Sequence, residues 1–498
     1  MMELKGRGAE VRRCIRINIL YVIPWDTTYK YKTAFIPSLS YQPLTLSTLA
    51  ALTMEKLNAK LNANITLVDE GVMKFDYTKT HYDIVGISVC TSSSTRGYEL
   101  ADYFKARGSY VIIGGHHATL LPNEAAEHAD SVFTGPAEFT LSAFFEDYIR
   151  DTPKPFYHAD GGHTGGVHVD KMPIPRRDHI PIPRHDHMPI PGSDHIPIPR
   201  RDHIPIPGSD HIPIPRRDLM PKKGYLKQPT IIADYGCGNS CKYCVIHSFW
   251  GGSSRQPISA VVDEIKSIGA KEYIFLDPSP LSNRTYAKEL FEALIPLRIK
   301  WAGLSTLDIS DDGELLAKMA KSGCIGTLLG FETFNADDLR SMNKYKNKIG
   351  EYSLVTEKLH EHGIAVLGTF MLGLDGDTKD SLRELPDLIA EVKIDVPRFA
   401  ILTPYPNTPL FNELESKKRI LHRDWSKYDS VHCIFKPKNM SASELESEHL
   451  DIWKRTYSTD RILSRLRFTP KRMGTVLITN IGFKIFAHKL RGLVQNRI

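Results

Sequence analysis

The sequence has few cysteines and no long apolar run. Only seven of its 498 residues are cysteine and four of these stand alone, which excludes the disulfide framework of a small secreted domain. No stretch approaches the ~20 apolar residues of a membrane-spanning helix. The first residues, MMELKGRGAEVRRC, lack the apolar core of a secretory signal. We therefore expect a cytoplasmic protein with a reducing environment.

The sequence also has little net charge. The net charge of +6 is modest for this length and gives no indication of a nucleic-acid partner. The excess is concentrated in residues 451–498, which hold 11 Lys and Arg but only two Asp. This tail predicts a solvated helix packed on the core. Contact of its basic side chains with a membrane surface is the alternative.

An eight-residue unit such as IPIPRRDH recurs six times between residues 172 and 219. Two prolines per unit exclude a helix or a central strand and leave polyproline II or turns. We interpret residues 151–224 as a Pro- and His-rich linker between domains, which must loop out or fold back if the flanking domains touch. The alternative is a metal-binding tract, because five units end in Asp-His.

The first part of the chain, residues 1–150, alternates strand and helix patterns. Apolar strand runs occur at IRINILYVI, NITLVDE, YDIVGISV, SYVIIGG and SVFTG, and helical spacing separates them. This order predicts a doubly wound, Rossmann-like parallel sheet. Such sheets bind ligands beyond the carboxyl ends of their strands. The residues expected there are Ser88, Thr91, Gly114, Gly115 and His117.

Three cysteines follow the strand pattern PTIIADYG at a C-x3-C-x2-C spacing: Cys237, Cys241 and Cys244. Structural zinc takes four protein ligands, so a zinc site would need a fourth, such as His247. A [4Fe–4S] cluster with three thiolates keeps one iron open for a substrate or cofactor. Both interpretations use the same three side chains.

After this loop, strand and helix patterns alternate again through residues 225–412. They predict a partial (β/α) barrel whose site lies at the carboxyl ends of its strands. A mostly α-helical extension is expected over residues 413–498. Cys324 occupies an apolar position and is expected to be a buried core cysteine, whereas Cys90 follows a first-domain strand and is expected to line the ligand pocket.

Together these motifs resemble the cobalamin-dependent radical S-adenosylmethionine enzymes. The cysteine loop matches their cluster motif, and VIIGGHHATLLPNEAAEHAD and VFTGPAEFT are similar to their amino-terminal cobalamin-binding domain. Pro136 stands where the family usually has Glu, and the loop IPWDTTYKYKTAF has no histidine. The resemblance therefore implies cobalamin without a protein histidine ligand. The segment RILHRDWSKYD, with Asp424 and Trp425, resembles the family's carboxyl-terminal extension.

The resemblance implies three sets of ligand residues. The cluster ligands are Cys237, Cys241 and Cys244. The residues implied for S-adenosylmethionine are Tyr243, Asp277, Ser305 and Glu332. Those implied for cobalamin are Ser88, Thr91, Gly114, Gly115, His117, Thr119, Gly135 and Glu138. At Asp277-Pro278-Ser279 the family often has Asp-Asp-Asn, so only the first acidic residue is kept.

The resemblance also implies an activity. The enzyme would cleave S-adenosylmethionine to a 5′-deoxyadenosyl radical and methylate an unactivated carbon of a small-molecule or lipid-like substrate, with an electron donor such as ferredoxin or flavodoxin. A cobalamin-using cyclase or oxidoreductase is an alternative that shares every motif. A metal-binding or scaffold protein acting through the Asp-His repeats is an alternative of a different class.

Overall fold

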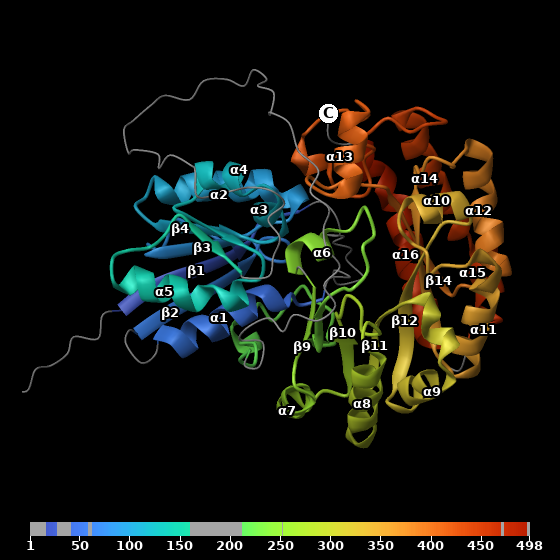
Figure 1. The fold of residues 1–498 in the computed structure, drawn as a ribbon, viewed down its shortest axis with the longest axis horizontal. Helices are drawn as coiled ribbons and strands as arrows, with labels where there is room; N and C mark the ends of the chain where they lie inside the picture. Colours follow the sequence, from blue (N-terminus) through green and yellow to red (C-terminus); the bar gives the residue numbers. More distant parts are fainter. Residues whose placement is uncertain are drawn as a thin grey trace, which may run out of the picture.

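The computed structural model describes residues 16–26, 41–57, 62–159, 212–250, 252–469 and 473–495. Residues 172–211, which hold most of the repeats, lie outside these ranges, as does most of the loop IPWDTTYKYKTAF. The predictions made for those two segments therefore stay predictions. The described residues form two six-stranded sheets, with helix α6 (Val245–Trp250) between them (Figure 1).

The first sheet is parallel throughout and has the strand order β2-β1-β3-β4-β5-β6. Its strands are β1 (Arg16–Ile23), β2 (Asn62–Asp69), β3 (Ile84–Ser88), β4 (Tyr110–Gly114), β5 (Ser131–Thr134) and β6 (Phe156–His158). Apolar side chains alternate between the two faces of each strand, so both faces bury a core.

Helices cover both faces of this sheet, as the doubly wound prediction requires. One face packs on α1 (Leu44–Leu57) and α5 (Leu141–Ile149). The other packs on α2 (Ser94–Lys105), α3 (His116–Leu120) and α4 (Pro122–His128) (Figure 1). The order reverses between β1 and β3, and the carboxyl ends of strands on either side of such a switch point form a natural ligand crevice.

The predicted boundary at residue 150 is wrong. Strand β6 pairs in parallel with β5, through Val132–Phe156, Phe133–Tyr157 and Thr134–His158, and thereby extends the first sheet to residue 158. Tyr157 is buried against Phe133, with ring centroids 5.1 Å apart. The three-residue strand FYH is too short to show an alternating pattern, which is why the sequence did not reveal it.

The end of the predicted linker does not loop away from the protein. The Arg216 amide donates to the Ser47 carbonyl of α1 at 2.9 Å, and Met220 is buried in the core of the first sheet. On the other side, the Arg217 guanidinium donates to Glu264 and to the Thr230 carbonyl, both at 2.6 Å. The described end of the last repeat unit therefore connects the two sheets directly.

The second sheet is also parallel, with the order β14-β13-β12-β11-β10-β7. Its strands are β7 (Thr230–Ile231), β10 (Glu272–Phe275), β11 (Lys300–Ser305), β12 (Cys324–Glu332), β13 (Ala365–Leu372) and β14 (Val396–Ile401). The strands follow in chain order and β7 and β14 are its two edges, so the sheet is the open, partial barrel predicted from the sequence.

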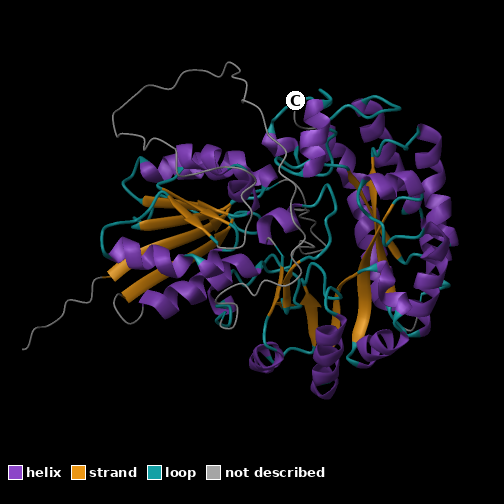
Figure 2. Cartoon of the chain, viewed as in Figure 1, coloured by secondary structure: helices purple, strands orange, loops and turns teal. Residues whose placement is uncertain are grey.

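Helices line the outside of the partial barrel (Figure 2). They are α7 (Ile258–Ile268), α8 (Arg284–Leu294), α9 (Gly313–Lys321), α10 (Ala336–Ser341), α11 (Tyr352–Glu361) and α12 (Lys379–Glu391). Cys324 begins β12 and is buried in this core, as expected. Burial raises the pKa of its thiol to about 12, as for an unreactive core cysteine.

The carboxyl-terminal extension is helical, as predicted. It contains α13 (Pro409–Ser416), α14 (Ala442–Thr456), α15 (Thr459–Leu466) and α16 (Met473–Gln495). Helix α14 packs on α12 and β14, and α16 packs on α14, where the rings of Phe486 and Trp453 lie 4.6 Å apart. Among the described residues, no helix combines the length and the apolar character needed to cross a membrane.

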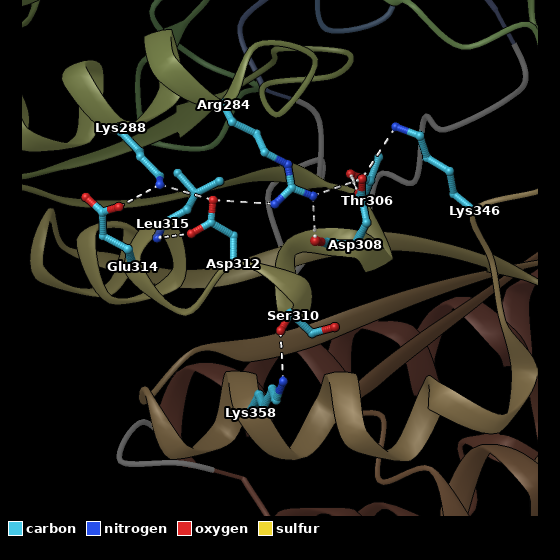
Figure 3. A network of polar contacts seen from close by, with 10 residues as sticks. All are labelled: Arg284, Lys288, Thr306, Asp308, Ser310, Asp312, Glu314, Leu315, Lys346 and Lys358. Atoms are coloured by element: carbon cyan, nitrogen blue, oxygen red, sulfur yellow. Dashed lines mark hydrogen bonds and ion pairs between the residues drawn. The ribbon is translucent and has the colours of Figure 1, made fainter.

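A network of ion pairs fixes the loop that follows β11 (Figure 3). The Asp308 carboxylate forms ion pairs with Arg284 of α8 at 3.3 Å and with Lys346 at 3.4 Å. Asp312 pairs with Lys288 at 3.2 Å, and the Lys358 ammonium of α11 donates to the Ser310 carbonyl at 2.8 Å. These contacts tie the β11 exit loop to the segment that follows α10.

Candidate active site

Helix α6 links the two sheets at the candidate site. It begins directly after Cys244, and the flanking segments β8 (Asp234–Gly236) and β9 (Ser253–Arg255) pair antiparallel, which closes the cysteine loop at its base. On its far side α6 packs on α3 of the first sheet, where the rings of Phe249 and His116 lie 4.3 Å apart. The cysteine loop therefore lies next to the ligand side of the first sheet.

We call the carboxyl ends of β3, β4 and β5, with the loops after them, the first-sheet edge. All eight residues implied for cobalamin lie on it: Ser88, Thr91, Gly114, Gly115, His117, Thr119, Gly135 and Glu138. The structure therefore brings them together, as the topology of a parallel sheet requires. Their contacts, however, are mostly with one another.

His117 is fully buried and both of its ring nitrogens have partners. Nδ1 lies 3.3 Å from the Thr91 hydroxyl and Nε2 lies 3.1 Å from Glu124 Oε1. The Trp425 indole donates to the other oxygen of Glu124 at 3.2 Å, and its ring lies 5.5 Å from that of His117. His117 thus joins the first sheet to the carboxyl-terminal extension, and its contact with cobalamin stays a prediction.

Thr119 and Gly115 shape the backbone of this edge. The Thr119 hydroxyl donates to the Gly115 carbonyl and accepts from the Gly135 amide, each at 2.9 Å. Gly115 has a φ of +102°, and a Cβ there would lie 2.6 Å from the Val89 carbonyl oxygen. Its glycine is therefore required by the neighbouring loop, independently of any ligand.

The three cysteines lie on the loop between β8 and α6, partly buried and free of disulfides. Burial raises the pKa of Cys244 to about 11, and the charges of Cys241 and Cys237 add to the shift, so the thiols interact electrostatically. Burial also raises the pKa of Cys241, against the opposing charge of Lys344. The loop thus gathers thiols that would be protonated alone and that bound iron would deprotonate.

This donor set fits a cluster. Three thiolates on one loop can each take a different iron of a [4Fe–4S] cube, whose fourth iron then stays open. Within the described ranges, no three or more His, Cys, Asp or Glu side chains are arranged to hold one metal ion. A single zinc ion would need the three cysteine sulfurs only ~4 Å from one another, given zinc–sulfur bonds of about 2.3 Å, and the described side chains are not arranged in that way.

Asp277 does not project freely toward a ligand as the resemblance implied. It is 2% exposed, and its Oδ1 accepts the amide of Ala233 at 2.7 Å and that of Asp234. These amides lie just before the cysteine loop, so this oxygen ties the exit of β10 to the base of the loop. The predicted direct contact to S-adenosylmethionine is open only to Oδ2, which accepts no hydrogen bond from any described residue.

Asp234 is a second buried carboxylate beside Asp277. It is 1% exposed, neither of its oxygens has a hydrogen bond within the described part of the chain, and Arg255 Nε lies 3.6 Å away. Burial and the charge of Asp277 raise the pKa of Asp234 to about 8, against the opposing charge of Arg255. Burial raises the pKa of Asp277 to about 6, against its backbone hydrogen bonds.

Glu332 ends β12 with a φ of +69°, a conformation that is strained for a residue other than glycine. Its Oε1 accepts the Tyr243 hydroxyl at 2.9 Å and pairs with the Lys344 ammonium at 2.8 Å. Tyr243 and Glu332 were both implied for S-adenosylmethionine, and the structure places them in contact. Glu332 therefore already takes part in an ion pair within the chain.

Ser305 and Thr306 lie at the carboxyl end of β11. Ser305 is 8% exposed and its hydroxyl donates to the Thr306 carbonyl at 3.4 Å. The Thr306 hydroxyl donates to Asp308 within the network of Figure 3. Direct contact of Ser305 with S-adenosylmethionine stays a prediction.

Sequence reasoning missed Lys344, Asp234 and the Phe249–His116 contact. Asp234 had a signal, since an acidic residue interrupts the apolar run PTIIADYG just before the cysteines. Lys344 had none, because it lies 100 residues after the loop that it faces. We call the cysteine loop with Asp234, Asp277, Ser305, Glu332 and Lys344 the second-sheet edge.

Comparison with known proteins agrees with this geometry. Residues 231–389 match the Radical SAM superfamily. The chain is 29% identical to bacteriochlorophyllide d C-12(1)-methyltransferase of Chlorobaculum tepidum, over 82% of each chain. It is 27% identical to bacteriochlorophyllide d C-8(2)-methyltransferase of the same organism, over 84% of this chain and 88% of the relative.

A solved structure shares the arrangement of both sheets. The cobalamin-dependent S-adenosylmethionine radical enzyme OxsB with aqua-cobalamin bound is 14% identical to this chain and superposes with a TM-score of 0.63. The match covers 96% of this chain and 73% of OxsB. The likeness confirms the predicted fold across nearly the whole chain.

Proposed function

The chain is a radical S-adenosylmethionine enzyme related to the cobalamin-dependent methyltransferases, and we propose that it methylates an unactivated carbon. Two relatives that are methyltransferases by name are similar to it over more than four fifths of both chains. The observation that carries the proposal is the position of the three-cysteine loop, which α6 connects directly to the first-sheet edge.

The residues of the chain have distinct tasks in this reaction. Cys237, Cys241 and Cys244 would hold the cluster, while the first-sheet edge would hold cobalamin. When bound, the cluster supplies the electron that cleaves the sulfonium, and cobalamin carries the methyl group. The rest of the site orients the substrate carbon and excludes water from reactive groups.

The buried carboxylates suit a positively charged ligand. Asp234 and Asp277 together leave three buried oxygens without a hydrogen bond among the described residues. Such oxygens are costly unless a cation or donor satisfies them. S-adenosylmethionine brings a sulfonium and an ammonium group to this side of the sheet, and either would lower that cost.

We propose a tetrapyrrole as the first substrate class to test, because both methyltransferase relatives act, by their names, on bacteriochlorophyllide d. A low-potential one-electron donor, such as ferredoxin or flavodoxin, is proposed as the partner that reduces the cluster.

The test is a labelled-methyl assay. The full chain is purified without oxygen, reconstituted with iron, sulfide and cobalamin, and incubated with a bacteriochlorophyllide, reductant and S-adenosylmethionine whose methyl group carries deuterium. We expect 5′-deoxyadenosine and a product that has gained the labelled methyl group. If 5′-deoxyadenosine forms but no label reaches any tetrapyrrole, the substrate class is wrong. If no 5′-deoxyadenosine forms at all, the proposed function is wrong.

A further inference from the structure

Lys344 is a cation that faces the cysteine loop from a distant part of the sequence. Its ammonium lies 2.8 Å from Glu332 Oε1, and the Tyr243 hydroxyl donates to the same oxygen at 2.9 Å. Tyr243 is the residue directly before the third cysteine, Cys244. One carboxylate oxygen therefore connects the lysine to the cluster loop.

The segment that carries Lys344 is fastened on both sides of it. The Asn343 amide group donates to the Ser240 carbonyl at 3.2 Å, and the Lys242 amide donates to the Met342 carbonyl at 3.2 Å. After the lysine, the Asn347 amide group donates to the Gly330 carbonyl at 2.8 Å. The segment thus runs between the cysteine loop and β12, and Lys344 has little freedom to leave.

The sequence also provides room for this ion pair. A Cβ on Gly330 would collide with the Glu332 carboxylate and would lie 3.1 Å from the Lys344 ammonium. The left-handed backbone of Glu332, with φ of +69°, turns its side chain into the same space. A strained residue that is held by two hydrogen-bonding partners is a built feature rather than a chance contact.

Lys344 also brings a positive charge to a poorly solvated place beside the cysteine loop. Its side chain is 20% exposed and that of Glu332 is 9% exposed, so the ion pair lies mostly out of water. Tyr243, which donates to the same Glu332 oxygen, directly precedes Cys244. Charges that are shielded from water interact more strongly than charges at the surface.

We propose that Lys344 is a positioning residue of the cluster: it fixes Tyr243 through Glu332, and its positive charge stabilises the cluster after one-electron reduction. This inference rests on the proposed function, because it requires a cluster at the three cysteines. In the step concerned, a low-potential one-electron donor is oxidised and the cluster gains one negative charge. No proton moves and no bond forms or breaks. A fixed cation nearby favours the more negative form.

The test compares Lys344→Met with Lys344→Arg in the full, reconstituted chain. Methionine keeps most of the apolar stem and removes the charge, whereas arginine keeps the charge. We expect Lys344→Met to lower the equilibrium constant for cluster reduction roughly tenfold, which for a one-electron couple is a shift of about 60 mV to more negative potential. Lys344→Arg should stay near the unaltered chain. The readout is an electron paramagnetic resonance titration without S-adenosylmethionine or substrate.

Lys346→Met is the matched control, because Lys346 lies on the same segment but is 60% exposed and pairs with Asp308. It should leave the potential unchanged. An unchanged potential in Lys344→Met with full iron content overturns the inference. Should Lys344→Met fail to take up iron, uptake by Lys344→Arg supports the positioning role and failure of both overturns it. A chain that takes up no cluster without any substitution overturns the proposed function as well.

Discussion

The first-sheet edge and the second-sheet edge are alike in topology but differ in the chemistry of their buried side chains. Both include the carboxyl ends of parallel strands, and the second edge also includes the cysteine loop that follows β8. On the first edge the buried polar side chains satisfy one another, as when His117 contacts both Thr91 and Glu124. On the second edge most of the buried groups are ionisable, and the oxygens of Asp234 have no hydrogen bond from described residues.

The difference indicates that the first-sheet edge is suited to recognise a ligand by its shape and the second-sheet edge by its charge. A self-satisfied edge is stable without a ligand and offers backbone and contour to a large cofactor. An edge with buried, incompletely satisfied charges is costly alone and gains when a charged group arrives. We infer that cofactor binding stabilises the second sheet more than the first, and the following predictions test that comparison.

The largest effect is expected for Cys241→Ser. A hydroxyl is a poor iron ligand, so the cluster and the formation of 5′-deoxyadenosine should be lost, while the first-sheet edge is untouched and cobalamin binding should remain. Iron analysis and the visible spectrum of bound cobalamin measure the two outcomes. Cys324→Ala, in the core of the same sheet, should keep its iron. Full iron content in Cys241→Ser would contradict the assignment.

Gly115→Ala should destabilise the first-sheet edge by about 3 kcal/mol, because strain at positive φ adds to a collision with the Val89 carbonyl. Gly108→Ala is the matched control: its φ is +81°, but no atom lies within 4 Å of the added Cβ. It should cost only about 1 kcal/mol. Urea unfolding followed by circular dichroism compares them. Equal losses would show that the collision is relieved by movement of the loop.

Much of the fold followed from the sequence. The alternation of apolar runs with helical spacing predicted both parallel sheets, because buried parallel strands are continuously apolar. Strand β6 escaped, since three residues carry no period and its place depends on pairing with β5. The contact of Arg216 with α1 escaped for a related reason: a proline-rich unit gives no local signal of what it will pack against.

The site was predicted in part. The cysteine spacing is a local pattern and could be read directly. By contrast, the backbone role of Asp277 depends on a partner more than 40 residues away, and Lys344 meets the more distant Tyr243 only through Glu332. A motif indicates which residue types a site contains. Whether a carboxylate contacts a ligand or instead accepts hydrogen bonds from a loop depends on its burial in the folded protein.

Asp234→Asn should reduce the dependence of stability on pH. The folded pKa of about 8 lies above the ordinary value of 3.8, so the folded state holds a proton that the unfolded chain loses. The contribution is therefore most favourable below pH ~4 and is lost as the pH rises toward 8. Between pH 6 and 8 the unaltered chain should lose about 2 kcal/mol more than the variant, because the free energy of unfolding changes by about 1.4 kcal/mol per pH unit well below the folded pKa and by less close to it. Urea unfolding across that range measures it, and Asp380→Asn, at an 88% exposed side chain, should behave like the unaltered chain.

The smallest effect is expected where the first-sheet edge meets the extension. Trp425→Phe keeps an aromatic ring beside His117 but removes the indole donor to Glu124, which should cost about 1 kcal/mol. Since Glu124 still accepts from His117, the destabilisation should stay local. We expect it to appear as faster hydrogen exchange in α4 and around residue 425. Tyr428→Phe removes a hydrogen bond within the extension, to the His422 carbonyl at 2.9 Å, and should leave α4 unchanged. If both variants accelerate exchange in α4 equally, the extension stabilises the first sheet through general packing and not through the Trp425–Glu124 bond.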